Sequence, residues 1–200
     1  MMDKHVFVET IPVRNGVFSD FAAHLRRMEK TSVQFYGKKI ETEKIKNVEI
    51  PVSPSIMKCR ILYDTDIRRI EFNYYRKRRI NSLKLVKDEN IDYSFKYANR
   101  EVFSRLLRQK GDCDDILIVQ SGCVTDTSYS NVVLFDGESY YTPDTYLLNG
   151  IRRQQLLASG KIKERRITPA MLSHFERLYL INSMLDIADD VSLPVTSLYL

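Results

Sequence analysis

The sequence feature that most constrains the fold is a short run that is apolar on both of its faces. Residues 116–119 read Ile-Leu-Ile-Val, between Asp115 and Gln120. Such a run is typical of a strand covered on both sides, so it predicts a buried strand in the interior of a sheet. With 200 residues, 44% of them hydrophobic, the chain can bury this strand in one large domain or in two small ones.

The start of the chain predicts a strand, a tight turn and a helix. Residues 5–13 predict the strand, and Asn15 and Gly16 after it form a pair that favours a hairpin turn. A helix capped at residues 19–20 and ended by Gly37 is expected next, because apolar residues recur at intervals of three to four.

Three strand-like runs follow, and a polar connector closes the first half of the chain. The runs cover residues 58–63, 69–75 and 83–86, and they predict an antiparallel meander packed on the first helix. The connector at residues 87–90 predicts a domain boundary. A first domain of residues 1–87 and a second domain of residues 88–200 are therefore expected.

The second half opens on a stretch in which a strand is expected to give way to a helix. Alternation predicts that the aromatic residues of 91–97 share one face of the strand and that Lys96 lies on the other. Helical spacing then predicts a helix over residues 99–110, ended by Gly111. Lys96 would thus stand at a strand end.

Beyond this helix the pattern predicts short strands and two more helices. The hydroxyl-rich stretch 124–131 is expected to form a turn around a single acid, Asp126. The other expected strands cover residues 115–120, 132–135, 139–142, 163–167 and 178–181, and the expected helices cover residues 147–160 and 171–177.

Charge, cysteine content and hydropathy narrow the class of protein. The net charge of +5 is a modest basic excess that forms no recognisable nucleic-acid motif, so no nucleic-acid partner is expected. An odd number of cysteines without paired spacing, and scattered histidines, indicate neither a disulfide framework nor a metal site. No apolar stretch is long enough to cross a bilayer and no secretion signal is recognisable, so a cytoplasmic protein without a membrane partner is expected.

Three features of the second half can serve one ligand. Lys96 can form an imine with an aldehyde, the amides of a helix that starts near Gly150 can bind a phosphate, and Asp126 can pair with a protonated ring nitrogen. Pyridoxal phosphate carries all three of these groups. The pattern therefore indicates a pyridoxal-phosphate site, and it leaves open whether the three features meet in space.

An ordered set of motifs resembles the class IV pyridoxal-phosphate enzymes, which include branched-chain and D-amino-acid aminotransferases and aminodeoxychorismate lyase. The likeness covers nearly the whole chain, and the order and spacing of the motifs make it specific. The motifs are Phe7-Val-Glu-Thr10, His24-Leu-Arg-Arg27, Lys96-Tyr-Ala-Asn-Arg100, Gly122-Cys-Val-Thr-Asp-Thr-Ser-Tyr-Ser-Asn131, Tyr141-Thr-Pro143, Leu147-Leu-Asn-Gly-Ile-Arg-Arg153 and Ile181-Asn-Ser183.

The resemblance implies an α+β fold of two domains, in which a small α/β sandwich domain accompanies a larger domain with a barrel-like sheet and flanking helices. It implies that Lys96 is the catalytic residue, which holds the cofactor covalently and then shuttles protons. It also implies a set of cofactor-binding residues: Arg27 and the backbone amides of Ile151 and Arg152 for the phosphate, Ser183 at the same end, and Asp126 beside the pyridine nitrogen.

Two departures from the family pattern concern the expected site. Asp126 stands where the family usually has a glutamate, and aspartate is one methylene shorter; Ser130 and Asn131 are expected to brace its turn. The arginine-rich stretch with which relatives grip the substrate matches no definite position. The arginines available for that task are Arg60, Arg68, Arg69 and Arg76.

The stretch 96–100 is more similar to the lyase pattern than to the branched-chain aminotransferase pattern. The expected activity is therefore a step of folate biosynthesis, the conversion of aminodeoxychorismate to 4-aminobenzoate and pyruvate. An aminotransferase acting on a branched-chain or D-amino acid is the alternative, and a non-catalytic binding or scaffold protein of the same fold is a second one. Relatives have their site at a subunit contact, so a homodimer is expected by analogy.

Overall fold

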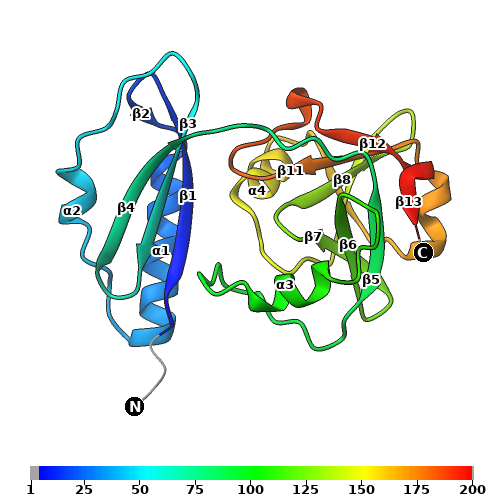
Figure 1. The fold of residues 1–200 in the computed structure, drawn as a ribbon, viewed down its shortest axis with the longest axis horizontal. Helices are drawn as coiled ribbons and strands as arrows, with labels where there is room; N and C mark the ends of the chain where they lie inside the picture. The colour runs from blue at the N-terminus through cyan, green and yellow to red at the C-terminus, as the bar shows by residue number, and fades with distance from the viewer. Residues whose placement is uncertain (1–4, 200) are drawn as a thin grey trace. The chain divides into compact units, whose positions relative to one another are not determined.

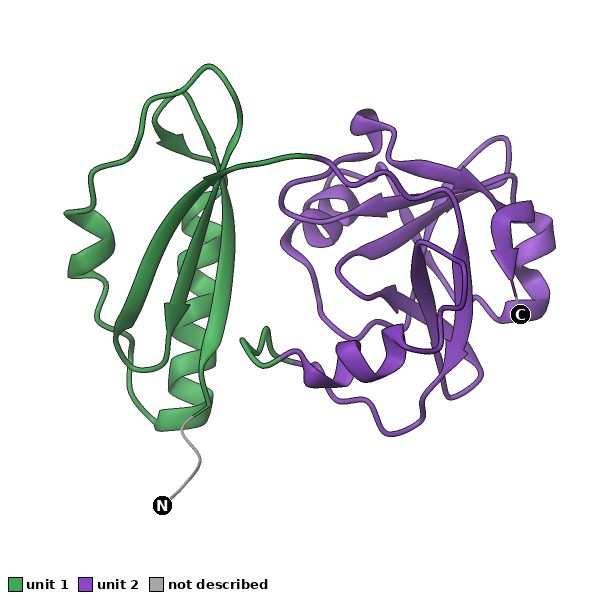
Figure 2. Cartoon of the chain, in the orientation of Figure 1, with its two compact units in different colours: residues 1–76, 95–99 green, residues 77–94, 100–200 purple. Residues whose placement is uncertain are grey.

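The computed structural model describes residues 5–199, and the chain divides into two compact units (Figures 1 and 2). Unit 1 comprises Met1–Arg76 and Phe95–Asn99, and unit 2 comprises Lys77–Ser94 and Arg100–Leu200. This division differs from the expected boundary between residues 87 and 88. Residue 87 ends a strand that is paired within unit 2, and the short segment around Lys96 returns to unit 1.

Unit 1 is built on an antiparallel sheet. Its strands are β1 (Phe7–Arg14), β2 (Val17–Phe18), β3 (Met57–Tyr63) and β4 (Ile67–Tyr74), in the order β2-β1-β3-β4. The hairpin between β1 and β2 is the predicted one, since its central residues Asn15 and Gly16 both have positive φ, 49° and 76°. A tight hairpin turn of this type needs positive φ at both positions, which asparagine and glycine tolerate best.

The predicted first helix is confirmed as α1 (Phe21–Tyr36), and a short helix α2 (Glu43–Lys46) follows it. Gly37 ends α1 in the left-handed region, with φ 68°, and its N–H donates to the carbonyl of Val33. The core between α1 and the sheet is mostly apolar. Its most deeply buried members, each at most 1% exposed, are Phe7, Ile11, Val13, Met28, Cys59, Ile61 and Tyr63.

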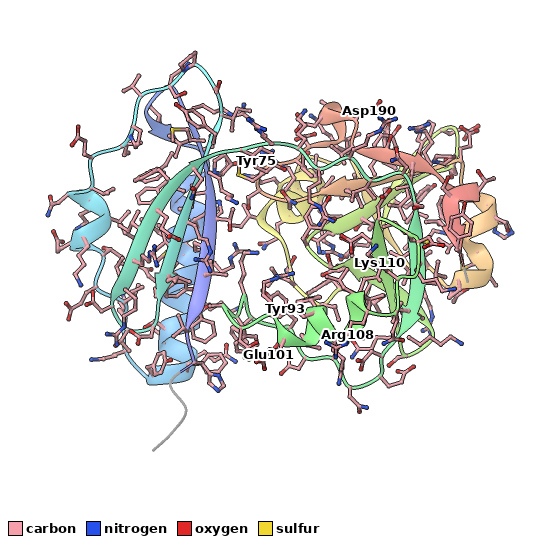
Figure 3. The ribbon with its side chains drawn as sticks, viewed as in Figure 1. Tyr75, Tyr93, Glu101, Arg108, Lys110 and Asp190 are labelled. Carbon is pink, nitrogen blue, oxygen red and sulfur yellow. The ribbon has the colours of Figure 1, made fainter. Side chains whose placement is uncertain are left out.

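The stretch before α3 (Glu101–Leu107) is not the strand that alternation predicts. Tyr93, labelled in Figure 3, packs against Phe103 of unit 2, with 4.6 Å between ring centroids. Phe95 and Tyr97 pack instead against Phe7 of unit 1. The expectation of one shared aromatic face is therefore wrong, because the chain passes from one unit to the other within this stretch.

Unit 2 contains two sheets. The first has the order β13-β5-β6-β7 and consists of β13 (Leu198–Tyr199), β5 (Leu83–Lys87), β6 (Asp115–Gln120) and β7 (Cys123–Thr127). The second has the order β10-β9-β8-β11-β12 and consists of β10 (Lys163–Arg165), β9 (Tyr140–Pro143), β8 (Asn131–Phe135), β11 (Arg177–Ile181) and β12 (Ser192–Pro194). The predicted buried strand is β6, in which residues 115–119 are at most 1% exposed.

Sheet membership corrects one prediction. Residues 83–86 were expected to complete a meander with β3 and β4, but β5 pairs in parallel with β6 of unit 2. Local pattern identifies the strand without identifying its partner, since parallel partners are distant in the sequence. The mixed α and β architecture itself is confirmed.

The helices of unit 2 are shorter than their sequence pattern suggests. α3 ends at Leu107, before the expected end at residue 110, and α4 (Ile151–Ala158) begins after Gly150. The helix expected over 171–177 is instead a 3-10 helix, η1 (Pro169–His174), and it ends before β11, which begins at Arg177. Two further 3-10 helices are η2 (Ile187–Asp189) and η3 (Val195–Ser197). No helix within residues 5–199 is both long enough and apolar enough to span a membrane.

Candidate active site

A buried carboxylate in unit 1 organises the surroundings of Arg27. Glu9 lies on β1 and is fully buried on the face that packs against α1, where His24 and Arg27 are one turn apart. Arg27 donates from Nε to Oε1 of Glu9 (2.7 Å) and from Nη2 to Oε2 (2.6 Å). His24 Nδ1 lies 2.7 Å from the same Oε2. Glu9 thus fixes one edge of the Arg27 guanidinium.

The pKa of Glu9 is lowered to about 2. Burial alone would raise this pKa, because the charged carboxylate loses its hydration. The charge of Arg27 and the hydrogen bonds from Arg27 and His24 outweigh burial, so Glu9 is an anion at neutral pH. Sequence reasoning missed Glu9 as a site residue. The sequence does contain a signal for it, because Glu9 alternates in step with Phe7 and Ile11 in an apolar strand and therefore shares their buried face.

Lys96 belongs to unit 1 and lies beside β1. Its carbonyl accepts the N–H of Val8 (2.9 Å), and Tyr97 N–H donates to the carbonyl of Phe95 (2.8 Å), so Lys96 is the central residue of a three-residue turn. The rings of Phe95 and Tyr97 both pack on Phe7, on the α1 side of the sheet. The two rings that flank Lys96 are therefore part of the unit 1 core.

Asp126 lies in β7 and not in the expected turn. Leu117 pairs with Thr127 and Val119 with Val124, so three residue steps on β7 lie opposite two on β6. This is the geometry of a β-bulge, which redirects a side chain from its regular position. Asp126 sits within the bulge and is only 6% exposed.

Neutral hydrogen-bond donors hold the Asp126 carboxylate from two sides. Oδ2 accepts the backbone N–H groups of Leu147 (3.2 Å) and Leu148 (3.0 Å), and Oδ1 accepts Nδ2 of Asn131 (2.9 Å). Burial raises the pKa of Asp126 to about 6, although these hydrogen bonds partly oppose it. The expectation that Asn131 braces Asp126 is confirmed, whereas Ser130 braces the turn through Thr127, with 2.7 Å between their hydroxyl oxygens.

Gly150 allows α4 to begin directly against Asn131. A Cβ at residue 150 would lie far inside van der Waals contact with Oδ1 of Asn131, so only glycine fits without a shift. Asn131 Nδ2 also donates to the carbonyl of Leu148 (2.8 Å). Gly150 therefore leaves the first turn of α4 without a capping side chain, and the backbone N–H groups of Ile151 and Arg152 belong to that turn.

The remaining expected residues lie near the same elements. Arg152 Nη1 pairs with Oδ2 of Asp186 at 3.3 Å, which links α4 to the turn that follows β11. Ser183 lies in this turn, two residues beyond Ile181, and Ile181 pairs with Asn131 of β8. Hydrogen bonds and strand pairing thus connect Asp126, the start of α4 and the Ser183 turn within unit 2.

The expected site residues form two groups, one in each unit. Unit 1 holds Lys96 and Arg27, joined through β1, and unit 2 holds the others. The other four are Asp126, Ile151, Arg152 and Ser183.

Comparison with known proteins gives the family. A family model described as amino-transferase class IV matches residues 67–192. A protein from Haemophilus influenzae is 34% identical over 182 residues, which cover 88% of this chain and 96% of that relative. A candidate 4-amino-4-deoxychorismate lyase from Haemophilus somnus 129PT is 31% identical, with a TM-score of 0.82 and coverage of 92% of this chain and 98% of that one.

A more distant structure shares the fold. The pyridoxal-phosphate-bound form of a hypothetical aminotransferase from Mycobacterium tuberculosis is 18% identical, with a TM-score of 0.72 and coverage of 91% of this chain and 78% of that one. The family model spans more than half of the residues, and the Haemophilus proteins are similar over nearly their full length. The chain therefore belongs to the class IV aminotransferase family of pyridoxal-phosphate-dependent lyases and aminotransferases.

Proposed function

We propose that this protein is a pyridoxal-phosphate-dependent lyase that converts aminodeoxychorismate to 4-aminobenzoate and pyruvate. The observation that carries the proposal is the buried Asp126 carboxylate, tied by two backbone amides to the loop that opens α4. In a ligand that has a protonated ring nitrogen and a phosphate, the nitrogen would pair with Asp126 and the phosphate with the first-turn amides of α4. Likeness to the candidate lyase from Haemophilus somnus over nearly both full chains favours lyase chemistry.

The donors and acceptors of the chain suit pyridoxal phosphate. Oδ2 of Asp126 accepts two N–H groups and Oδ1 accepts one; since a carboxylate oxygen can accept two, Oδ1 retains a position for a ring N–H. The first-turn amides of α4 suit a phosphate, because helix N-termini favour anions. Arg27 adds a guanidinium whose Nε and Nη2 edge is already fixed by Glu9.

Each residue then has a defined task. Bound pyridoxal phosphate supplies an aldehyde that joins amines and a ring that withdraws electrons from the adjoining bonds. Lys96 would hold it through Nζ, and as a free amine it would take a proton from the substrate ring, so that pyruvate can leave and the ring can become aromatic. Asp126 would keep the ring nitrogen protonated, and the α4 amides and the Arg27 guanidinium are the groups that would suit the phosphate.

An aminotransferase acting on a branched-chain or D-amino acid is the second candidate. It is favoured by the fold shared with the Mycobacterium tuberculosis aminotransferase, one form of which is described with α-ketoglutarate and PMP bound. In that reaction Lys96 would move a proton between the α-carbon of the substrate and the cofactor. A keto acid would then be consumed, whereas the lyase needs none.

We further propose a homodimer that acts in the cytoplasm. The described cysteines, Cys59, Cys113 and Cys123, are buried free thiols, which suits a reducing compartment. The dimer is proposed by analogy with the family. Sedimentation of the purified protein at micromolar concentration should give twice the mass of one chain, and a monomer would contradict this part of the proposal.

Colour and product release test the proposed activity. The purified protein should be yellow, lose its visible band on borohydride reduction, and then carry the cofactor mass on a peptide containing Lys96. Lys96→Ala should abolish this labelling, whereas Lys87→Ala, at an exposed strand end, should retain it. Pyruvate should appear from aminodeoxychorismate without a keto acid. A colourless protein that takes up no added cofactor would contradict the proposal and support a scaffold role.

A further inference from the structure

A buried arginine supports the loop that holds Asp126. Arg153 lies in the first turn of α4, and only 2% of it is exposed. The loop, residues 144–150, joins β9 to α4, and its Leu147 and Leu148 N–H groups donate to Oδ2 of Asp126. A charged side chain is costly to bury, so a guanidinium in this position needs partners.

The guanidinium of Arg153 contacts both ends of this loop and its middle. Nη2 donates to the carbonyl of Pro143 (2.9 Å), where β9 ends, and Nη1 donates to Oδ1 of Asn149 (3.4 Å), just before α4. Between these two contacts, Cζ of Arg153 lies over the ring of Tyr146, 4.4 Å from its centroid. A planar fork of donors suits this task, because it can bind several acceptors at once.

Glu164 compensates the charge of Arg153 from outside the loop. Its Oε1 accepts Nη2 of Arg153 (2.6 Å), and it lies on β10, which pairs in parallel with β9. The Glu164 side chain is 50% exposed, and contact with water weakens such an ion pair. The Pro143 carbonyl and the Tyr146 ring contact the guanidinium independently of this carboxylate. Arg153 can therefore hold the loop without the ion pair.

We propose that Arg153 is a positioning residue, which holds the loop 144–150 in the conformation that directs the amides of Leu147 and Leu148 to Asp126. Asp126 binds the middle of the loop, whereas Arg153 binds its two ends as well. Arg153 thus acts on the site through the loop. The assignment deepens the proposed function, and it rests on that function only for the role of Asp126 beside a ring nitrogen.

Hydrogen exchange of the Leu147 and Leu148 amides, followed by NMR on the full-length protein as isolated, tests the assignment. Arg153→Met should speed exchange of both amides about 10-fold or more, because the loop loses its contacts with the guanidinium. Arg153→Lys should speed it as well, since an ammonium keeps the charge but lacks the fork that reaches both loop ends. Exchange at the parent rate in either variant would overturn the assignment.

The pKa of Asp126 is a second readout, which a role confined to packing would leave unchanged. Burial raises this pKa to about 6, and the hydrogen bonds from the loop amides and the charge of Arg153 limit the rise. After removal of any bound cofactor, NMR of the carboxyl carbon in Arg153→Met should give a pKa about one unit higher than in the parent protein. Arg153→Lys should give a smaller rise. A parent-like pKa in Arg153→Met would overturn the assignment.

Two control variants separate the loop contacts from other effects of charge. Glu164→Gln removes the ion pair and leaves the loop contacts of Arg153, so exchange should stay within about threefold of the parent rate. Arg108→Met removes one positive charge at the exposed end of α3, which is labelled in Figure 3, and should change neither readout. An effect in either control equal to that of Arg153→Met would overturn the assignment.

The borohydride test separates this assignment from the proposed activity. Faster exchange and a raised Asp126 pKa in Arg153→Met, together with an unlabelled Lys96 in the parent protein, would support the positioning role and contradict the cofactor chemistry. Labelled Lys96 with parent-like exchange in Arg153→Met would do the reverse. Melting temperatures within a few degrees of the parent protein would exclude misfolding as the cause of any change.

Discussion

Two buried carboxyl groups of this protein have pKa values that their surroundings shift in opposite directions. Glu9 is paired with a guanidinium, which lowers its pKa to about 2, whereas Asp126 is held chiefly by neutral amides and its pKa rises to about 6. Glu9 is therefore a fixed anion that orients Arg27. Asp126 can gain or lose a proton near neutral pH, so a ring cation beside it would determine its charge.

The ion pair of Glu9 predicts a loss of stability in acid. The pKa of Glu9 is lower in the folded chain (about 2) than the ordinary glutamate value of 4.5, so the ionised form stabilises the fold above pH 4.5. This contribution, about 3 kcal/mol from the size of the shift, is lost as the pH falls from 4.5 towards 2. Glu9→Gln should therefore lower the free energy of unfolding in urea by about 3 kcal/mol at pH 7, and by progressively less below pH 4.5.

Glu43→Gln is the control for this prediction. Glu43 forms an exposed ion pair with Lys46 on α2. Replacement of Glu43 should therefore change the free energy of unfolding by less than about 1 kcal/mol, both at pH 7 and at pH 3. A constant difference between Glu9→Gln and the parent protein from pH 7 to pH 3 would show that ionisation of Glu9 is not the source of the stability.

At the scale of elements, hydrogen bonds join the bulge in β7 to the loop that precedes α4. The bulge directs Asp126 to the amides of Leu147 and Leu148, and Asn131 joins Asp126 to the loop carbonyl of Leu148. These contacts keep residues 147–150 out of the helix, which is why α4 begins later than its sequence pattern suggests. The position of the helix N-terminus is thus set by a carboxylate from another strand.

This dependence explains how much of the fold the sequence predicts. Apolar runs, helical spacing and turn residues are local, so they identify β1, α1 and β6 correctly. The partner of β5, the bulge and the start of α4 depend on residues distant in the chain, which local patterns do not register. The same limit applies to the site: family motifs indicate Lys96 and Arg27, but their common attachment to β1 through Val8 and Glu9 becomes evident only in the structure.

Gly150 provides a test of the contact between these elements. Its φ of −66° is open to alanine, so Gly150→Ala should act only through the clash with Asn131 and lower the free energy of unfolding by about 1–3 kcal/mol. In an Asn131→Ala background the clash is absent, and the same substitution should then cost almost nothing. Urea unfolding of the two single variants and the double variant measures this coupling. Additive losses would show that Gly150 is needed for a reason other than its approach to Asn131.

At the scale of the whole molecule, the chain passes between the units three times, after residues 76, 94 and 99. The last two crossings bracket Lys96. The aromatic residues around it are divided, since Tyr93 packs on Phe103 in unit 2 and Phe95 packs on Phe7 in unit 1. The lysine is therefore carried by a short segment that packs in the core of unit 1 and continues at both ends into unit 2.

This division of the aromatic residues predicts that neighbouring substitutions destabilise different units. Phe95→Ala should speed amide hydrogen exchange in β1 and leave α3 protected, because Phe95 covers Phe7 of unit 1. Tyr93→Ala should speed exchange in α3 and spare β1, because its ring packs on Phe103. Exchange followed by mass spectrometry on peptides from β1 and α3 distinguishes the two patterns. Equal acceleration of both elements in both variants would mean that the units open together.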